Sequence, residues 1–133
     1  MVTCLDSTII IDFLKGRKEA VSIIKEYKEK DALATTEINV FEIFLGIYLK
    51  EEISNEEILK ATELFNALLV LPFDNPSGKE AAQIYASLHK KGKLIEQNDI
   101  FIASIMKNNG LSEIITKNKD HFSRIEDIKV ISY

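Results

Sequence analysis

Apolar residues recur with two different spacings at the start of the chain, and the change of spacing predicts a strand followed by helices. The segment 2-VTCLD-6 is short and mostly apolar, which is typical of a buried strand. After it, apolar side chains recur at helical spacing and Gly16 ends the helix; they are Ile9, Ile10, Phe13 and Leu14. A second helix is amphipathic, with an apolar face made of Ala20, Ile23, Ile24 and Tyr27.

The rest of the chain continues this alternation of strands and helices. We expect strands at 32–37, 69–73, 113–116 and 128–132 and helices at 37–50 and 98–110. Two further helices have start signals: Ser54 and Glu57 form a capping box, and Asn75 and Pro76 form an N-cap and first-turn pair for a helix through about Leu88. Alternating strands and helices predict a mostly parallel sheet covered on both faces. We therefore expect a single α/β domain over residues 1–133, a three-layer α/β/α sandwich of about five strands.

Composition and charge narrow the function classes. With 46% hydrophobic and 29% charged residues, disordered and fibrous classes are excluded. The net charge of −4 does not fit a basic nucleic-acid coat protein, although an enzyme that binds nucleic acid through a metal ion and a local basic rim stays compatible with it. Because the sequence shows neither a basic leader nor a long apolar segment, we expect a cytoplasmic protein with no membrane association. The lone Cys4 is expected to be a core thiol.

Polar residues follow the predicted strands, where parallel sheets bind ligands. These positions are Asp6, Thr35, Thr36, Thr116, Asn118 and Asp120. Two more carboxylates, Glu42 and Asp99, stand in apolar helices, where isolated burial would be costly. Carboxylates gathered in one crevice repel each other unless a cation compensates them, and Mg²⁺ or Mn²⁺ prefers such oxygen ligands. The pattern therefore predicts metal-assisted hydrolysis of a phosphodiester.

Each of these residues also has a structural interpretation. Asp6 could cap the first helix, and Asp99 could complement a helix dipole from the first turn. Glu42 has only apolar neighbours, which favours a functional or at least paired carboxylate. Asp12 and Glu37 are expected to face solvent, and Asn118 and Asp120 could serve a local turn.

Other chemistry has little support. His89 and His121 lack metal-motif spacing and are expected to be surface or structural residues. No glycine-rich nucleotide-binding loop is present. Two clusters of basic residues are either solvated faces or contacts for a nucleic-acid backbone. The first is Lys15, Arg17 and Lys18, and the second is Lys90, Lys91 and Lys93.

Four segments together resemble the PIN-domain family, and most closely its VapC-like branch of toxin ribonucleases from type II toxin–antitoxin systems. They are 5-LDSTIIIDFLKG-16, 36-TEINVFEIFLG-46, 98-NDIFIASI-105 and 115-ITKNKDHFSRI-125. Each pattern is loose alone, but their order and placement at strand ends make the combination specific. The resemblance extends across nearly the whole chain.

The resemblance implies a Mg²⁺- or Mn²⁺-dependent endoribonuclease, dimeric and silenced by a cognate antitoxin that covers the active site. Asp6, Glu42 and Asp99 match the acidic active-site positions of the family, and Thr8 and Thr116 match its hydroxyls. The fourth acidic position falls on the neutral Asn118, with Asp120 as an alternative. By this likeness Asp6 and Asp99 bind the metal and Glu42 positions or deprotonates the attacking water. Thr8, Thr116 and Asn118 would orient carboxylates and waters. Lys15, Arg17 and Lys18 would contact RNA phosphates.

Two other functions stay open from the sequence. One is a PIN-like module that binds RNA or protein without turnover, which the neutral Asn118 suggests. The other is an aspartyl-phosphate phosphatase of the haloacid-dehalogenase kind with Asp6 as nucleophile. That motif requires a second Asp two residues later, where this chain has Thr8.

Overall fold

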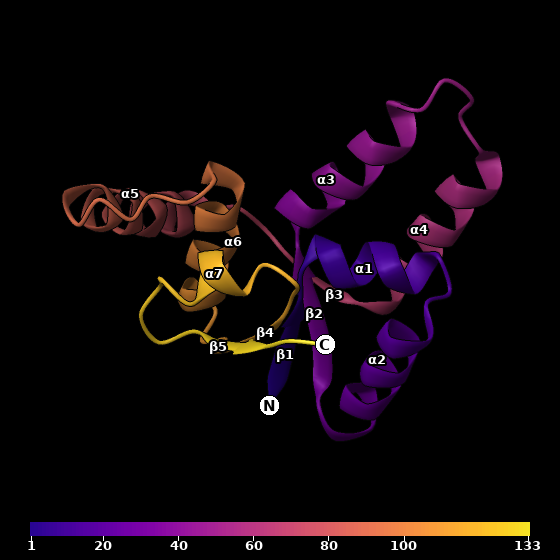
Figure 1. Ribbon diagram of the computed structural model, residues 1–133, viewed down its shortest axis with the longest axis horizontal. Helices are drawn as coiled ribbons and strands as arrows, with labels where there is room; N and C mark the ends of the chain where they lie inside the picture. The colour runs from indigo at the N-terminus through magenta and orange to yellow at the C-terminus, as the bar shows by residue number, and fades with distance from the viewer.

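Helices cover both faces of a five-stranded parallel sheet, which gives the protein three layers (Figure 1). The computed structural model describes residues 1–133. In chain order the elements are β1 (Val2–Leu5), α1 (Ser7–Leu14), α2 (Lys18–Lys30), β2 (Ala32–Thr36), α3 (Glu37–Tyr48), α4 (Asn55–Ala67), β3 (Leu69–Leu71), α5 (Asn75–Lys90), α6 (Gln97–Asn108), β4 (Glu113–Ile115), α7 (Lys119–Phe122) and β5 (Lys129–Ile131). The strand order is β3-β2-β1-β4-β5, and all neighbours are parallel. The predicted three-layer α/β/α architecture is confirmed.

The central strand β1 ends between the carboxyl ends of β2 and β4. Cys4 of β1 is in register with Ala34 of β2 and with Ile114 of β4. Because the strands are parallel, the chain leaves all three of them at the same edge of the sheet. Asp6 and Thr116 follow β1 and β4, and Thr36 ends β2, so the three polar positions reach one edge.

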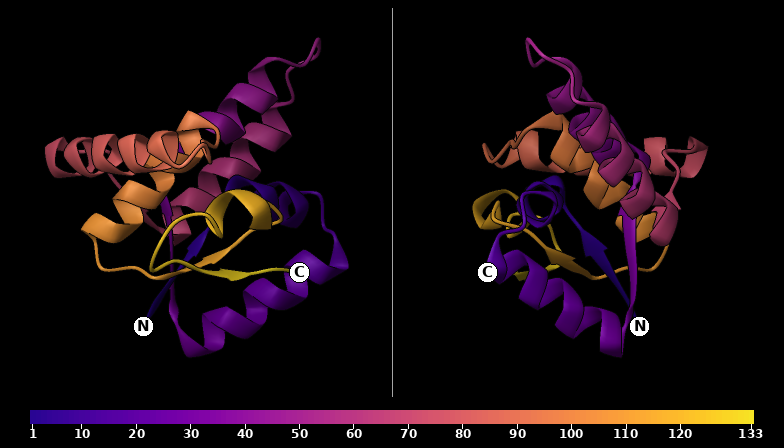
Figure 2. Two further views of the ribbon diagram at one scale, coloured as in Figure 1. Left: turned by 60° about the vertical axis from the view of Figure 1, so that its left-hand side comes forward. Right: turned by 90° about the vertical axis from the view of Figure 1, so that its right-hand side faces the viewer.

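The sheet separates two hydrophobic cores, each covered by its own set of helices (Figure 2). On one side α5, α6 and α7 contribute Ile84, Ile102 and Phe122, and on the other side α1 to α4 contribute residues such as Ile9 and Ile47. Full burial of one such side chain is worth about 1.5–3 kcal/mol, so the apolar stripes seen in the sequence drive both layers onto the sheet. Cys4 is also fully buried, and burial raises the pKa of its thiol, which confirms a core role.

Helix starts follow the sequence signals with one correction. Thr36 caps α3, where its hydroxyl accepts from the Asn39 backbone and the Asn39 side chain accepts in return. The predicted N-cap Asn75 is wrong by one residue, because Asp74 accepts from the Ser77 backbone and Asn75 is already helical. The short helix α7 was predicted only as a turn. None of the helices combines the length and apolar character that a membrane crossing requires.

Candidate active site

Asp6 lies at the carboxyl end of β1 with only 2% of its surface exposed. It occupies the N-cap position of α1 but makes no side-chain capping hydrogen bond, so the capping interpretation is wrong. Its Oδ2 instead accepts from the hydroxyls of Thr116, at 2.6 Å, and Thr8, at 3.2 Å, and its Oδ1 accepts from the Asn39 amide at 3.3 Å. Residues from α1, from α3 and from the loop after β4 therefore orient this carboxylate.

Glu42 reaches the same crevice from α3. Its Oε1 accepts from the Ser7 hydroxyl at 2.7 Å, and its Oε2 accepts from the Asn98 amide at 3.4 Å. Asn39 also donates to the Ser7 hydroxyl at 3.0 Å, so a chain of hydrogen bonds joins Glu42 to Asp6. Burial raises the pKa of Glu42, and the nearby negative charge of Asp6 raises it further.

Asp99 is in the first turn of α6 and is 4% exposed. Its Oδ2 lies 2.6 Å from Nδ1 of His121, which is part of α7. Burial raises the pKa of Asp99 to about 6 against the opposing effect of this hydrogen bond, and the charges of Asp6 and Glu42 also raise it. All three predicted acidic residues thus share one electrostatic environment.

This donor set suits a hard divalent cation. Two of the three carboxylates have raised pKa values, which a bound cation would reverse by favouring their charged forms. As the side chains stand, no group of three or more His, Cys, Asp or Glu residues is arranged to ligate one ion. An ion held by one or two carboxylates and by water, as Mg²⁺ prefers, fits this arrangement better than a cage of protein ligands.

The loop after β4 contributes hydroxyl and backbone groups rather than a fourth acid. Thr116 is fully buried, and its hydroxyl accepts from the Asn118 backbone N–H at 2.9 Å while it donates to Asp6. Asn118 is half-buried and its amide makes no hydrogen bond. Asp120 is exposed and its carboxylate accepts none. Thr35 does not enter the crevice, because its hydroxyl donates to the Leu5 carbonyl at 2.8 Å.

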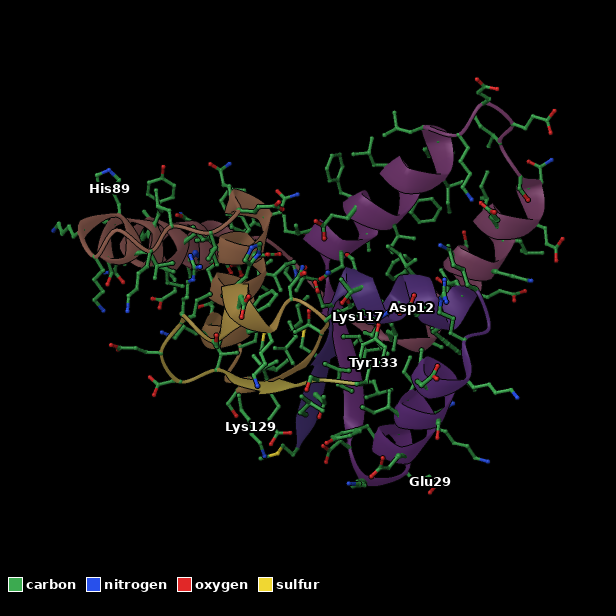
Figure 3. The ribbon with its side chains drawn as sticks, in the orientation of Figure 1. Asp12, Glu29, His89, Lys117, Lys129 and Tyr133 are labelled. Atoms are coloured by element: carbon green, nitrogen blue, oxygen red, sulfur yellow. The ribbon has the colours of Figure 1, made fainter.

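Sequence reasoning missed four partners of the acidic residues: Ser7, Asn39, Asn98 and His121. Two signals were present. Asn39 and Glu42 are three residues apart and so share a helix face, and Asn98 directly precedes Asp99. His121 was predicted to be a surface or structural residue, and it is partly exposed; its partner Asp99 was not predicted. His89 is exposed on α5 as predicted (Figure 3).

A groove runs from the crevice between α1, α3 and α4. Its volume is about 450 Å³, and its lining includes Ile11, Leu14, Lys15, Glu42, Ile47 and Lys50. Lys15 therefore lies on the same groove as Glu42, whereas Arg17 pairs with Asp12 and Lys18 is exposed at the start of α2. A partner that filled this groove would cover one carboxylate of the crevice.

Fold and crevice together define a PIN domain: residues 3–128 match the PIN domain family, and the chain belongs to it. Among curated relatives, Ribonuclease VapC3 of Methanocaldococcus jannaschii is 36% identical over 105 residues, covering 79% of this chain and 98% of the relative. Ribonuclease VapC1 of the same organism is 31% identical over 147 residues, covering 97% of this chain and 85% of the relative. The family resemblance drawn from the sequence is confirmed.

Solved structures agree with this family. VapBC2 from Rickettsia felis, bound to a DNA fragment from its promoter, superposes with a TM-score of 0.89 at 19% identity and covers 100% of this chain and 99% of that chain. VapBC-1 from nontypeable Haemophilus influenzae gives a TM-score of 0.84 at 26% identity, covering 99% of this chain and 98% of that chain. The whole chain therefore has the fold seen in these proteins.

Proposed function

We propose that this protein is a Mg²⁺- or Mn²⁺-dependent endoribonuclease that hydrolyses RNA phosphodiester bonds as the toxin of a toxin–antitoxin pair. The observation that carries the proposal is the convergence of Asp6, Glu42 and Asp99, from three separate parts of the chain, on one crevice. Hydrogen bonds link Asp6 to Glu42 there, and the charges of both act on Asp99. The curated relatives named ribonucleases support the activity. The expected place of action is the cytoplasm.

The chain's own groups divide the work. Asp6 and Asp99 would hold the cation, which supplies polarisation of the phosphodiester and charge neutralisation when bound. Thr8, Thr116 and Asn39 fix the orientation of the Asp6 carboxylate. Glu42 accepts a proton from the attacking water, and its raised pKa brings it closer to neutral pH, where a general base is most effective. Ser7 and Asn98 hold the Glu42 carboxylate in place.

The direct test is cleavage of single-stranded and structured RNA by the purified protein. We expect cleavage with Mg²⁺ or Mn²⁺, none with EDTA, and a loss of about 10²–10⁴-fold in kcat for Glu42→Gln, which removes the base. Glu29→Gln is the matched control, because Glu29 is exposed at the far end of α2 (Figure 3). Cleavage that persists in EDTA, or an active Glu42→Gln variant, contradicts the mechanism.

The groove beside Glu42 supports an antitoxin partner. Solved neighbours include a toxin-antitoxin complex from Klebsiella pneumoniae. A Cβ added at Gly46, which lines the groove, would meet no atom within 4 Å, so the backbone accepts a side chain here and Gly46→Leu narrows the groove. We expect this variant to cleave RNA but to escape inhibition by a purified cognate antitoxin. Unchanged inhibition would place the antitoxin elsewhere.

An exposed apolar stripe on α3 supports self-association into a homodimer. Phe41, Leu45 and Tyr48 are 57%, 41% and 53% exposed and recur at helical spacing on α3. Light scattering with size-exclusion chromatography should give twice the monomer mass, and Phe41→Ser should reduce it. A monomer at all concentrations contradicts the dimer.

One observation favours the alternative of a binding module without turnover. The position of the fourth acid is the neutral Asn118. RNA binding without cleavage under any metal condition would establish this alternative. The phosphatase alternative has less support, since Thr8, in place of the second Asp, donates to Asp6.

A further inference from the structure

A second charged cluster lies on α1 beyond the crevice, and its centre is Asp12. We name Asp12, Arg17, Lys117 and Tyr133 the Asp12 cluster. Asp12 was predicted to face solvent, but it is only 7% exposed. Lys117 Nζ lies 2.5 Å and the Tyr133 hydroxyl 2.8 Å from its Oδ2, and Arg17 Nε lies 3.2 Å from its Oδ1. Figure 3 shows Asp12, Lys117 and Tyr133 together beside α1.

The cluster holds more positive than negative charge. The hydrogen bond from Lys117 is the main cause that lowers the pKa of Asp12, so this carboxylate stays ionised at neutral pH. Within the cluster one anion, Asp12, faces two cations, Lys117 and Arg17, while the negative charge of Asp6 acts on Tyr133 from the neighbouring crevice. Their side chains are 52% and 58% exposed, which leaves both cations open to an anion from solution.

The cations are held in place rather than free. Lys117 Nζ also lies 5.2 Å from the centroid of the Tyr133 ring, which is cation–π distance. Burial and the hydrogen bond to Asp12 raise the pKa of the Tyr133 hydroxyl, so it remains a donor to Asp12. Side chains fixed before binding lose less conformational entropy when a ligand arrives.

The cluster is anchored to the candidate active site through the backbone. The Lys117 N–H donates to the Thr8 hydroxyl at 3.0 Å, and the preceding Thr116 donates to Asp6. Asp12 is six residues after Asp6, which is about 9 Å along a helix axis. This offset is too large for contact with the bond cut beside Asp6, but it suits a neighbouring phosphate of the same strand.

We propose that Lys117 and Arg17 form a phosphate-binding subsite for the RNA strand, held in position by Asp12 and Tyr133. This inference rests on the proposed ribonuclease function. RNA is favoured over an acidic protein segment because Lys117 belongs to the loop that orients Asp6, where a substrate strand must pass, and Arg17 contacts the same Asp12 carboxylate as Lys117. The subsite contacts the RNA backbone and so positions the strand, but it does not recognise the base sequence.

The test is the salt dependence of binding to a single-stranded RNA oligonucleotide, measured by fluorescence anisotropy in EDTA. Each lost phosphate contact lowers the slope of log K against log salt by about 0.7 for a single strand. The double variant Lys117→Gln/Arg17→Gln should therefore lose about 1.4 from the slope and roughly 25-fold in affinity at 0.1 M salt. In cleavage assays KM should rise with little change in kcat.

Two further variants separate this subsite from a structural ion-pair network. Lys117→Arg/Arg17→Lys keeps both charges and should retain the slope. Lys25→Gln/Lys28→Gln removes two exposed charges from α2 that make no ion pair, and should change the slope by less than half as much. Urea denaturation reports any loss of stability separately.

The outcomes distinguish the subsite from the ribonuclease function. If the wild type cleaves RNA and the Gln double variant keeps the wild-type slope, the subsite is wrong and the function stands. If the slope falls as expected but no RNA is ever cleaved, the function is wrong and the subsite stands. A double variant that loses only antitoxin binding assigns the cations to a protein partner and overturns the subsite.

Discussion

Asp6 and Asp99 are nearly equally buried at the starts of two helices, yet their surroundings differ. Three neutral donors, Thr8, Thr116 and Asn39, hold Asp6. Asp99 has a single side-chain partner, His121, and burial raises its pKa to about 6. Burial alone therefore does not decide how well a carboxylate is accommodated. The number of donors around it does, and the Asp99 side depends most on a cation.

The largest expected effect comes from neutralising either carboxylate. Asp6→Asn and Asp99→Asn should each lower the rate of RNA cleavage by on the order of 10³-fold without unfolding the protein, because a metal contribution of several kcal/mol is removed. Rate measurements with Mn²⁺ titration, together with circular dichroism, check this. If Asp6→Asn keeps its activity and Asp99→Asn loses it, Asp6 is not a metal ligand and only Asp99 binds the metal.

The next largest effect is on stability in the metal-free protein, where Asp99 should make the free energy of unfolding depend on pH. The folded-state pKa of Asp99, about 6, is above the ordinary value of 3.8 for an aspartate, so its carboxyl group stabilises the fold below about pH 4. This contribution is lost as pH rises through 6. Asp99→Asn should therefore gain on the order of 3 kcal/mol relative to wild type between pH 4 and pH 7 in EDTA.

Urea denaturation at several pH values measures this difference. Saturating Mg²⁺ should reduce it, because bound cation stabilises the charged carboxylate. A wild type and a variant whose stabilities stay parallel across this pH range would show that Asp99 is not strained in the absence of metal.

Removing the single partner of Asp99 should have a smaller effect. His121→Ala should weaken Mn²⁺ affinity and kcat/KM by about 10- to 100-fold, the range for groups that orient a metal ligand. His89→Ala is the matched control, since His89 is exposed on α5 and stacks only on Tyr85. Isothermal titration with Mn²⁺ gives a readout independent of activity. Equal behaviour of the two variants would contradict a positioning role for His121.

The smallest expected effect is on the Asp6 side, where donors are redundant. Thr8→Val removes one of three hydrogen bonds to Asp6 and also the acceptor of the Lys117 N–H, which water can replace because Lys117 is exposed. We therefore expect a loss of about 1 kcal/mol in the free energy of unfolding and a less than tenfold change in kcat. Denaturation and cleavage assays check both values. A Thr8→Val effect larger than that of His121→Ala would reverse the comparison.

The sequence predicted the fold and the acidic positions because both follow from local patterns. Strand ends, apolar periodicity and caps can be read over a few residues, and parallel strands then bring Asp6 and Thr116 to one edge. The same patterns could not show the burial of Asp12, whose partners Lys117 and Tyr133 are 105 and 121 residues away. Adjacent cap residues such as Asp74 and Asn75 are equivalent by composition, so only geometry separates them.

The two hydrophobic cores lie on opposite faces of the sheet, and each supports part of the crevice. Glu42 projects from α3, which packs on the smaller core, and Asp99 lies in the first turn of α6, which packs on the larger core. Relative motion of the two helical layers would change the separation of the carboxylates before either layer melted. Natural selection for catalysis in this chain therefore also constrains the rigidity of the entire sandwich.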